Sequence, residues 1–304
     1  MSQDSSALQA ASALVSGSGT FGTWGFLPVT DGIFIQSAPS QALLHRKVNG
    51  LNHLSGNNAE EGLLFTTQNI TTEIDLLAWI HLVFPLFTDE DIAKLLYYYP
   101  SSNTSDTPAN LTAFATAGDE GPTALNISQR ATGQQQRAAN IYGETTFVCP
   151  SYWLAEAYNT NGRTGFKYQY SVVNAAHGTD ITAYFGPPSA NQGPDFVLAF
   201  QRIWGNFITT GNPSISSGIA NGARVNGSSK NALEDWPVFA MWDRRMANLN
   251  QTGGTLTPKK GSSNFIYTGT GVTNDLELVD AYEWEGGRGN RCDFWRSVWD
   301  LVPE

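Results

Sequence analysis

"FKYQYSVVNAAHGTD" (residues 166–180) joins a predicted β-strand to a loop that carries a histidine. The first eight residues alternate in character, which is typical of a strand. His177 then follows among small residues, next to Gly178 and three positions before Asp180. A structural histidine usually lies among bulky neighbours, so this setting favours one that must approach other groups closely. Spacing alone leaves both a packing role and a proton-transfer role open for His177.

Helical and extended patterns alternate along the rest of the chain, which predicts an α/β fold. The sequence "GLNHLSGN" (50–57) indicates a second strand, followed by a loop at 57–62. Ligands of parallel sheets lie at the carboxyl ends of strands, and the loops 57–62 and 174–180 both occupy such ends. Helices are predicted at 72–84, 88–99, 127–141, 146–159, 195–207 and 290–302, and short extended pieces at 236–242 and 264–269. The segment 26–35 is predicted to be a loop, then a turn at Asp31-Gly32, then a short apolar strand. The segments 101–125 and 214–233 are predicted to be loops.

Composition indicates a folded chain that does not bind polyanions. Of the 304 residues, 41% are hydrophobic and 12% aromatic, so a large core can form, while only 14% are charged. The net charge is −10 and the pI is about 4.8. Without a positive face to neutralise phosphates, neither a nucleic acid nor an anionic membrane surface is expected as a partner. No apolar run approaches the roughly 18 residues of a transmembrane helix.

Several features favour a secreted glycoprotein. Two cysteines are present, and in an oxidising compartment they could pair only with each other, whereas in the cytosol they would be buried thiols. The first 19 residues have neither a basic nor an apolar region and do not form a signal peptide, so we expect the chain to begin partway through a longer protein. The N-x-S/T sequons, which are candidate glycosylation sites, are Asn69, Asn103, Asn110, Asn126, Asn226 and Asn250.

An acid after one strand and a histidine after a later one match part of a serine hydrolase. In such enzymes a carboxylate orients the histidine that activates the serine. In α/β-hydrolases the order is Ser, acid, His, and Glu60 or Glu61 precedes His177 in that order. However, no G-x-S-x-G nucleophile turn and no HGGG-type oxyanion segment occurs in these 304 residues.

Five ordered motifs resemble the carboxyl-terminal half of the type B carboxylesterases, the family of the cholinesterases and the fungal secreted lipases. The resemblance covers nearly the whole chain. The sequence departs from the usual pattern at Ala59-Glu60, where Lys-Asp is more common, and at Asp180, where Glu is common. The motifs are "PVTDGIFI" (28–35), "GNNAEEG" (56–62), "HGTD" (177–180), "WGNFITTGNP" (204–213) with "WP" (236–237), and "FVCP" (147–150) with "RCDFW" (291–295).

The resemblance implies that residues 1–304 are the carboxyl-terminal portion of a single α/β-hydrolase domain with an incomplete central sheet flanked by helices. It implies Glu61 as the acid and His177 as the base of a Ser-Glu-His triad, and a Cys149–Cys292 disulfide. The nucleophile, the oxyanion hole and the signal peptide would lie upstream, so the chain alone would be inactive. The substrate would be a small-molecule or lipid carboxylic ester, the location extracellular, and the missing amino-terminal half a possible partner.

Other readings stay open for individual residues and for the chain. Glu60 competes with Glu61, which is favoured because it directly precedes Gly62. Surface or core roles suffice for the remaining histidines, although His53 is a rival base. No cluster of ligands has metal spacing, so neither a metal nor a cofactor is expected. The alternative functions are a non-catalytic binding or adhesion module of the same fold and a truncated gene product. The other two histidines are His45 and His81.

Overall fold

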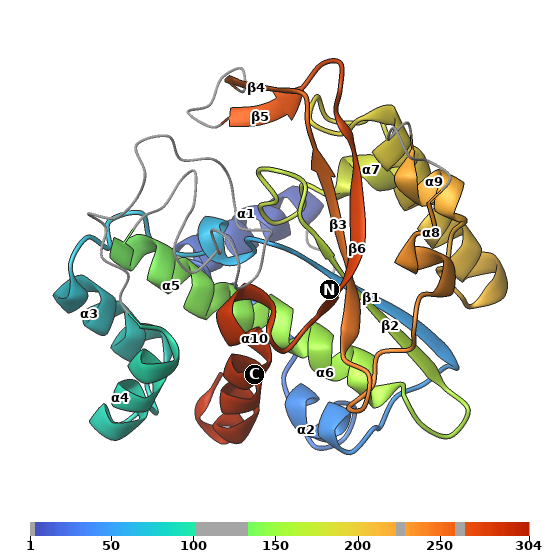
Figure 1. Cartoon of the computed structure of the whole chain (residues 1–304). Coiled ribbons are helices and arrows are strands. Elements are labelled where there is room, and N and C mark those ends of the chain that lie inside the picture. The colour runs from blue at the N-terminus through green and yellow to red at the C-terminus, as the bar shows by residue number, and fades with distance from the viewer. Residues whose placement is uncertain (1–3, 101–132, 223–228, 259–264, 304) are drawn as a thin grey trace.

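The computed structural model describes residues 4–100, 133–222, 229–258 and 265–303. A mixed β-sheet lies between two groups of helices (Figure 1). Its first three strands run parallel to one another, and the last is antiparallel to its neighbour. In spatial order the strands are β1 (Asn52–Asn58), β2 (Thr164–Tyr170), β3 (Arg245–Thr252) and β6 (Thr273–Asp280). A separate antiparallel pair is formed by β4 (Thr255–Pro258) and β5 (Phe265–Thr268).

The helices form two layers with one hydrophobic cluster on each side of the sheet. The first layer and its outer hairpin comprise α5 (Gly133–Gly143), η3 (Glu144–Val148), α6 (Cys149–Ala157), α10 (Trp284–Ser297), α3 (Glu73–Val83) and α4 (Asp89–Tyr98). The second layer comprises α7 (Ile181–Phe185), α8 (Pro194–Thr210) and α9 (Ser217–Asn221). The remaining elements are α1 (Ser5–Gly17), α2 (Pro39–Leu44), η1 (Gly62–Leu64), η4 (Ala232–Asp235) and η5 (Trp299–Leu301).

Helix α3 begins where the sequence predicts it to begin. The Thr72 hydroxyl accepts a hydrogen bond from the Asp75 N–H at 3.2 Å, and the Asp75 carboxylate accepts one from the Thr72 N–H at 2.8 Å. This capping box satisfies two backbone donors that a helix start leaves unpaired. The prediction of a helix at 72–84 is therefore confirmed, and the strand predicted at 166–173 is confirmed as β2.

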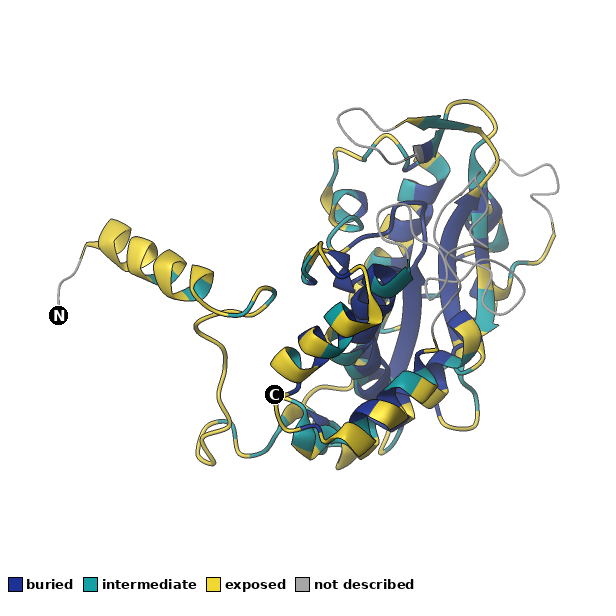
Figure 2. Cartoon of the chain, turned by 90° about the vertical axis from the view of Figure 1, so that its left-hand side faces the viewer, coloured by how far each residue is buried: buried dark blue, intermediate teal, exposed yellow. Residues whose placement is uncertain are grey.

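The short strand predicted after the turn at Asp31-Gly32 is wrong. The predicted turn does form, because Asp31 Oδ1 accepts hydrogen bonds from the N–H groups of residues 33–35 at 2.8–3.0 Å. Ile33 and Phe34, which follow the turn, are exposed, however, and the segment pairs with no strand among the described residues. With α1 this segment forms an arm that projects from the body of the molecule (Figure 2).

Two predictions for the carboxyl-terminal third need correction, and two strands there were missed. The segment 236–242 contains only an isolated bridge at Ala240, and the predicted loop 214–233 contains the short helix α9. Strands β3 and β6 were not predicted at all. Strand β3 carries buried polar side chains such as those of Asn248 and Gln251, so its sequence lacks the alternation by which strands are recognised.

A buried ionic cluster and a disulfide join α10 to the first helical layer. The Glu144 carboxylate accepts hydrogen bonds from Arg288 at 3.0 Å, from Arg291 at 2.7 and 2.8 Å, and from the Tyr99 hydroxyl at 2.6 Å. The three charged side chains are each 3% exposed. One turn later the Cys149–Cys292 disulfide links α6 to α10. The ionic cluster and the disulfide together hold α10 against η3 and α6.

Candidate active site

Two loops meet at the carboxyl ends of β1 and β2. Parallel pairing places Asn58, the last residue of β1, beside Tyr170, the last residue of β2. The pairing continues into the loops, because the Ala59 N–H donates to the Tyr170 carbonyl and the Glu60 N–H donates to the Ala175 carbonyl, both at 3.0 Å. The residues that follow on each strand are thereby brought side by side.

His177 and Glu61 meet where these loops join. His177 Nδ1 lies 2.5 Å from Glu61 Oε2, which is the length of a short charge-assisted hydrogen bond. Glu61 is 5% exposed, whereas the His177 side chain is 40% exposed. Within the described part of the chain no group hydrogen-bonds to the second ring nitrogen, Nε2. The buried acid therefore orients a histidine whose other nitrogen can take a proton.

Two glycines allow this geometry. A Cβ on Gly62 would lie 1.8 Å from the Ala139 carbonyl oxygen and 2.6 Å from the Gly143 nitrogen, so only glycine lets η1 approach α5 this closely. Gly178 has φ +77°, a left-handed conformation that lets the chain turn directly after His177. Both residues belong to the motifs that carry the resemblance, "GNNAEEG" and "HGTD".

The surroundings of His177 stabilise its protonated form. The hydrogen bond to Glu61 raises the pKa of His177 above its ordinary value, and the charges of Glu61 and Asp180 act in the same direction, while burial opposes them. Phe65 meets the imidazole edge-on at 5.0 Å between ring centroids, and Phe147 lies at 4.7 Å. These rings restrict the imidazole to one orientation toward Glu61.

The rival residues lie in other settings. The backbone of Glu60 bridges to Ala176, and it is Glu61 whose carboxylate reaches His177. His53 stacks on Tyr158 with ring centroids 4.9 Å apart, and burial followed by the Lys167 charge lowers the pKa of His53. His45, which follows the last residue of α2, and His81 of α3 are both exposed. Among the described residues, His177 is the histidine that forms a hydrogen bond with a carboxylate.

The sequons differ in accessibility. Asn69 is exposed between η1 and α3. Asn250, in contrast, is 7% exposed and pairs with Asp275 across β3 and β6, so a glycan cannot be attached there without opening the sheet. The sequons Asn103, Asn110, Asn126 and Asn226 lie outside the described residues.

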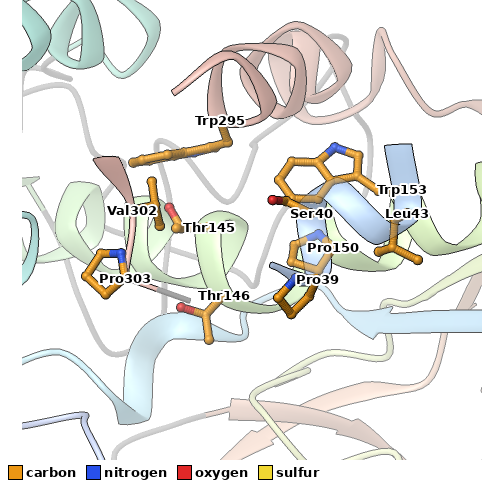
Figure 3. Close-up of a pocket in the computed structure, with 10 residues that line it drawn as sticks. All are labelled: Pro39, Ser40, Leu43, Thr145, Thr146, Pro150, Trp153, Trp295, Val302 and Pro303. Carbon is orange, nitrogen blue, oxygen red and sulfur yellow. The ribbon is translucent and has the colours of Figure 1, made fainter. Parts of the chain in front are cut away.

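A pocket of about 270 Å³ lies beside η3, and its lining does not include His177 (Figure 3). Thr145 and Thr146 of η3 line it, whereas the next residue, Phe147, contacts His177. Trp153 and Trp295 also line it, and the lining includes neither Glu61 nor His177. No group of three or more potential metal ligands occurs in the part of the chain that the structure describes. The helices of that part include none that is both long and apolar enough to cross a membrane.

A mixed sheet flanked by helices, with an acid and a histidine at the carboxyl ends of adjacent strands, is typical of the α/β-hydrolase fold. The crystal structure of Aspergillus niger EstA is similar, with a TM-score of 0.58 at 17% identity over 92% of this chain and 46% of that chain. The model of the carboxylesterase family matches residues 1–265. The chain therefore belongs to the carboxylesterase family.

Two curated relatives are fungal lipases by name. Secreted lipase 4 of Gibberella zeae is 24% identical over 224 residues, which are 71% of this chain and 35% of that protein. A secreted lipase of Arthroderma benhamiae is 24% identical over 207 residues, which are 62% of this chain and 33% of that protein. The chain thus spans about a third of the length of these relatives.

Proposed function

We propose that Glu61 and His177 are the acid and the base of a Ser-Glu-His triad that hydrolyses carboxylic esters. The observation that carries the proposal is the 2.5 Å contact between His177 Nδ1 and the buried Glu61 carboxylate, while the His177 side chain is 40% exposed. Membership of the carboxylesterase family supports the reaction class.

The chemistry follows from this arrangement. Glu61 accepts the Nδ1 proton of His177, which leaves Nε2 as the acceptor for the proton of a serine hydroxyl. The serine oxygen attacks the ester carbonyl while the imidazolium is stabilised by the Glu61 carboxylate. The imidazolium then returns its proton to the departing alcohol, which leaves the acyl group on the serine. The same two residues next activate a water molecule, which releases the carboxylic acid product from the serine. The raised pKa of His177 is consistent with stabilisation of the imidazolium.

The nucleophile is proposed to come from polypeptide outside these 304 residues, which contain no G-x-S-x-G turn. Residues 1–304 would then be the carboxyl-terminal portion of a single carboxylesterase domain, and the preceding portion would supply the serine and the oxyanion-binding amides. The matched part of this chain corresponds to only 35% and 33% of the lengths of the two relatives, which supports this view. Without that portion, the chain would not turn over esters.

The proposed substrate is a small-molecule or lipid carboxylic ester, and the proposed location is extracellular. Both relatives are named secreted lipases, and the Cys149–Cys292 disulfide suits an oxidising compartment. Among the sequons in the described residues, the exposed Asn69 is the one that we propose to be glycosylated.

The nucleotide sequence immediately upstream of the Met1 codon tests the proposal most simply. We expect an open frame that encodes a G-x-S-x-G turn, and we expect the purified 304-residue chain to show no hydrolysis of p-nitrophenyl butyrate above buffer. An upstream frame without a nucleophile turn would favour the non-catalytic module. Hydrolysis by the chain alone that His177→Ala abolishes would refute an external nucleophile.

A further inference from the structure

The two oxygens of the Glu61 carboxylate have different partners. Oε2 faces His177, whereas Oε1 accepts hydrogen bonds from the Asn58 backbone N–H at 2.6 Å and from the Asn58 side-chain Nδ2 at 3.3 Å. A carboxylate held at one oxygen only could rotate about its last bond. Asn58 thus fixes the plane in which Glu61 presents Oε2 to the imidazole.

The Asn58 amide also reaches the second loop. Its Nδ2 donates to Asp180 Oδ1 at 3.2 Å, in addition to Glu61 Oε1. The amide nitrogen has two hydrogens, so it can serve both carboxylates at once. With the amide turned over, its oxygen would face two carboxylates, so the hydrogen bonds themselves determine its orientation. Asn58 is 5% exposed, which shields these bonds from water.

Asp180 is held from its other side as well. Asp180 Oδ2 accepts a hydrogen bond from the Tyr184 hydroxyl at 2.8 Å, and that hydroxyl lies 2.5 Å from the Tyr168 hydroxyl. Tyr168 belongs to β2 and Tyr184 to α7, so the carboxylate is anchored to the sheet and to the helix that follows the histidine loop. Its position is therefore set by the scaffold and not by solvent.

The two contacts between the loops, Glu61 with His177 and Asn58 with Asp180, have the same spacing along the chain. Asn58 lies three residues before Glu61, and Asp180 lies three residues after His177. One loop thus gives an amide donor and a carboxylate acceptor, and the other gives an imidazole donor and a carboxylate acceptor. A shift of either loop would strain both hydrogen bonds together, which restricts the loops more than a single contact could.

We propose that Asn58 and Asp180 are positioning residues that hold the Glu61 carboxylate and the His177 loop in the geometry needed for proton transfer. The inference rests on the proposed function for its chemical purpose, because the pair is what the proposed triad requires. Neither residue touches the ester in this scheme. Both act on the pair, Asn58 through the orientation of Glu61 and Asp180 through the amide and through its charge.

The electrostatics around the imidazole agree with this arrangement. Glu61 is the main group that raises the pKa of His177, and Asp180 adds to it through its charge. The other groups packed against His177 are the uncharged rings of Phe65 and Phe147. Lys167 on β2 interacts with the charge of Glu61, and burial lowers the pKa of Lys167 well below its ordinary value. The side chain of the neighbouring Glu60 is buried.

The experiment follows the His177 imidazole by NMR in the isotopically labelled 304-residue chain. The variants are Asn58→Leu, which removes both side-chain hydrogen bonds, Asp180→Asn, which removes the charge, and Asp180→Glu, which restores it. Asp243→Asn is the matched control, because Asp243 precedes β3 and so lies at the opposite end of the parallel strands from His177. Two quantities are measured, the His177 pKa and the low-field Nδ1–H resonance.

Asn58→Leu is expected to broaden or abolish the Nδ1–H resonance, and Asp180→Asn to lower the His177 pKa more than the control does. Asp180→Glu should restore most of the pKa shift. The proposal is overturned if Asn58→Leu leaves both quantities unchanged in a folded protein, or if Asp180→Asn and the control behave alike. Should Asn58→Leu fail to fold, the partly exposed Asp180 decides the result alone. This experiment does not measure ester turnover. Its result therefore stays informative about Asn58 and Asp180 even if the protein proves not to hydrolyse esters.

Discussion

Replacing Glu144 by glutamine should destabilise the fold strongly. The substitution removes the carboxylate that pairs with Arg288 and Arg291, of which Arg288 also interacts with the charge of Glu285. The side chains of the three ion-paired residues are each 3% exposed. Removing one partner of a buried ion pair costs about 3–5 kcal/mol. Although burial alone would raise it, the pKa of Glu144 is lowered to about 2 by Arg291 and Arg288, against an ordinary 4.5. At about 1.4 kcal/mol for each pKa unit, this difference corresponds to roughly 3 kcal/mol.

The pH dependence gives the same prediction a second test. Because the pKa of Glu144 is lower in the folded state than in the unfolded state, its contribution is complete above about pH 4.5 and is lost as the pH falls toward 2. The difference in unfolding free energy between the wild type and Glu144→Gln should therefore be largest near neutral pH and shrink below pH 4.5. Urea titrations followed by tryptophan fluorescence measure it, since Trp295 donates a hydrogen bond to Tyr99 beside Glu144.

Glu90→Gln is the matched control. Glu90 forms an ion pair with Lys94 at 2.9 Å on the surface of α4, where the two side chains are 80% and 54% exposed. Exposed pairs of this kind contribute little, so we expect a change below about 0.5 kcal/mol. A loss of less than about 1 kcal/mol for Glu144→Gln at pH 7, or a loss that does not change between pH 7 and pH 3, would refute the reasoning.

Three further predictions concern the site and its supports. Glu61→Gln should lower the pKa of His177, because Glu61 is the main group that raises it, and an NMR titration that finds the pKa unchanged would contradict the assigned contact. Gly62→Ala should destabilise the fold by about 1–3 kcal/mol or more through the 1.8 Å approach to the Ala139 carbonyl, whereas Gly205→Ala in open space on α8 should be neutral or stabilising in thermal melts. Replacing both Cys149 and Cys292 by serine should lower the free energy of unfolding by up to about 5 kcal/mol, because the disulfide joins residues 143 positions apart and so restricts a long loop of the unfolded chain. A loss below about 1 kcal/mol in urea titrations would show that the disulfide does not constrain the unfolded chain.

Local patterns predicted the elements that follow local rules. Helix α3 begins at a Thr-x-x-Asp box, and β2 alternates in character, so both could be recognised from a few residues. Strand β3 could not, because Asn248 and Gln251 are buried by tertiary contacts that no short window contains. The segment 26–35 shows the opposite case, in which apolar residues indicate a strand although no described strand lies beside them.

The candidate site divides in the same way. The resemblance pointed to Glu61 and His177 through short motifs, and the structure brings these two side chains together. The hydrogen bond between Asn58 and Asp180 joins residues 122 positions apart, so no local pattern could reveal it. The only available signal was position, since each residue lies within a motif and three residues from the acid or the histidine. Position alone does not indicate an orientation of side chains.

In the proposed mechanism, His177 serves as the base for a serine supplied from outside these residues. The most direct test of this role is the rate of p-nitrophenyl butyrate hydrolysis by the protein in which residues 1–304 follow the polypeptide encoded upstream. His177→Ala should lower kcat/KM by at least about 10³-fold, whereas His53→Ala should leave it within a few fold. Equal rates for the wild type and His177→Ala would contradict the account.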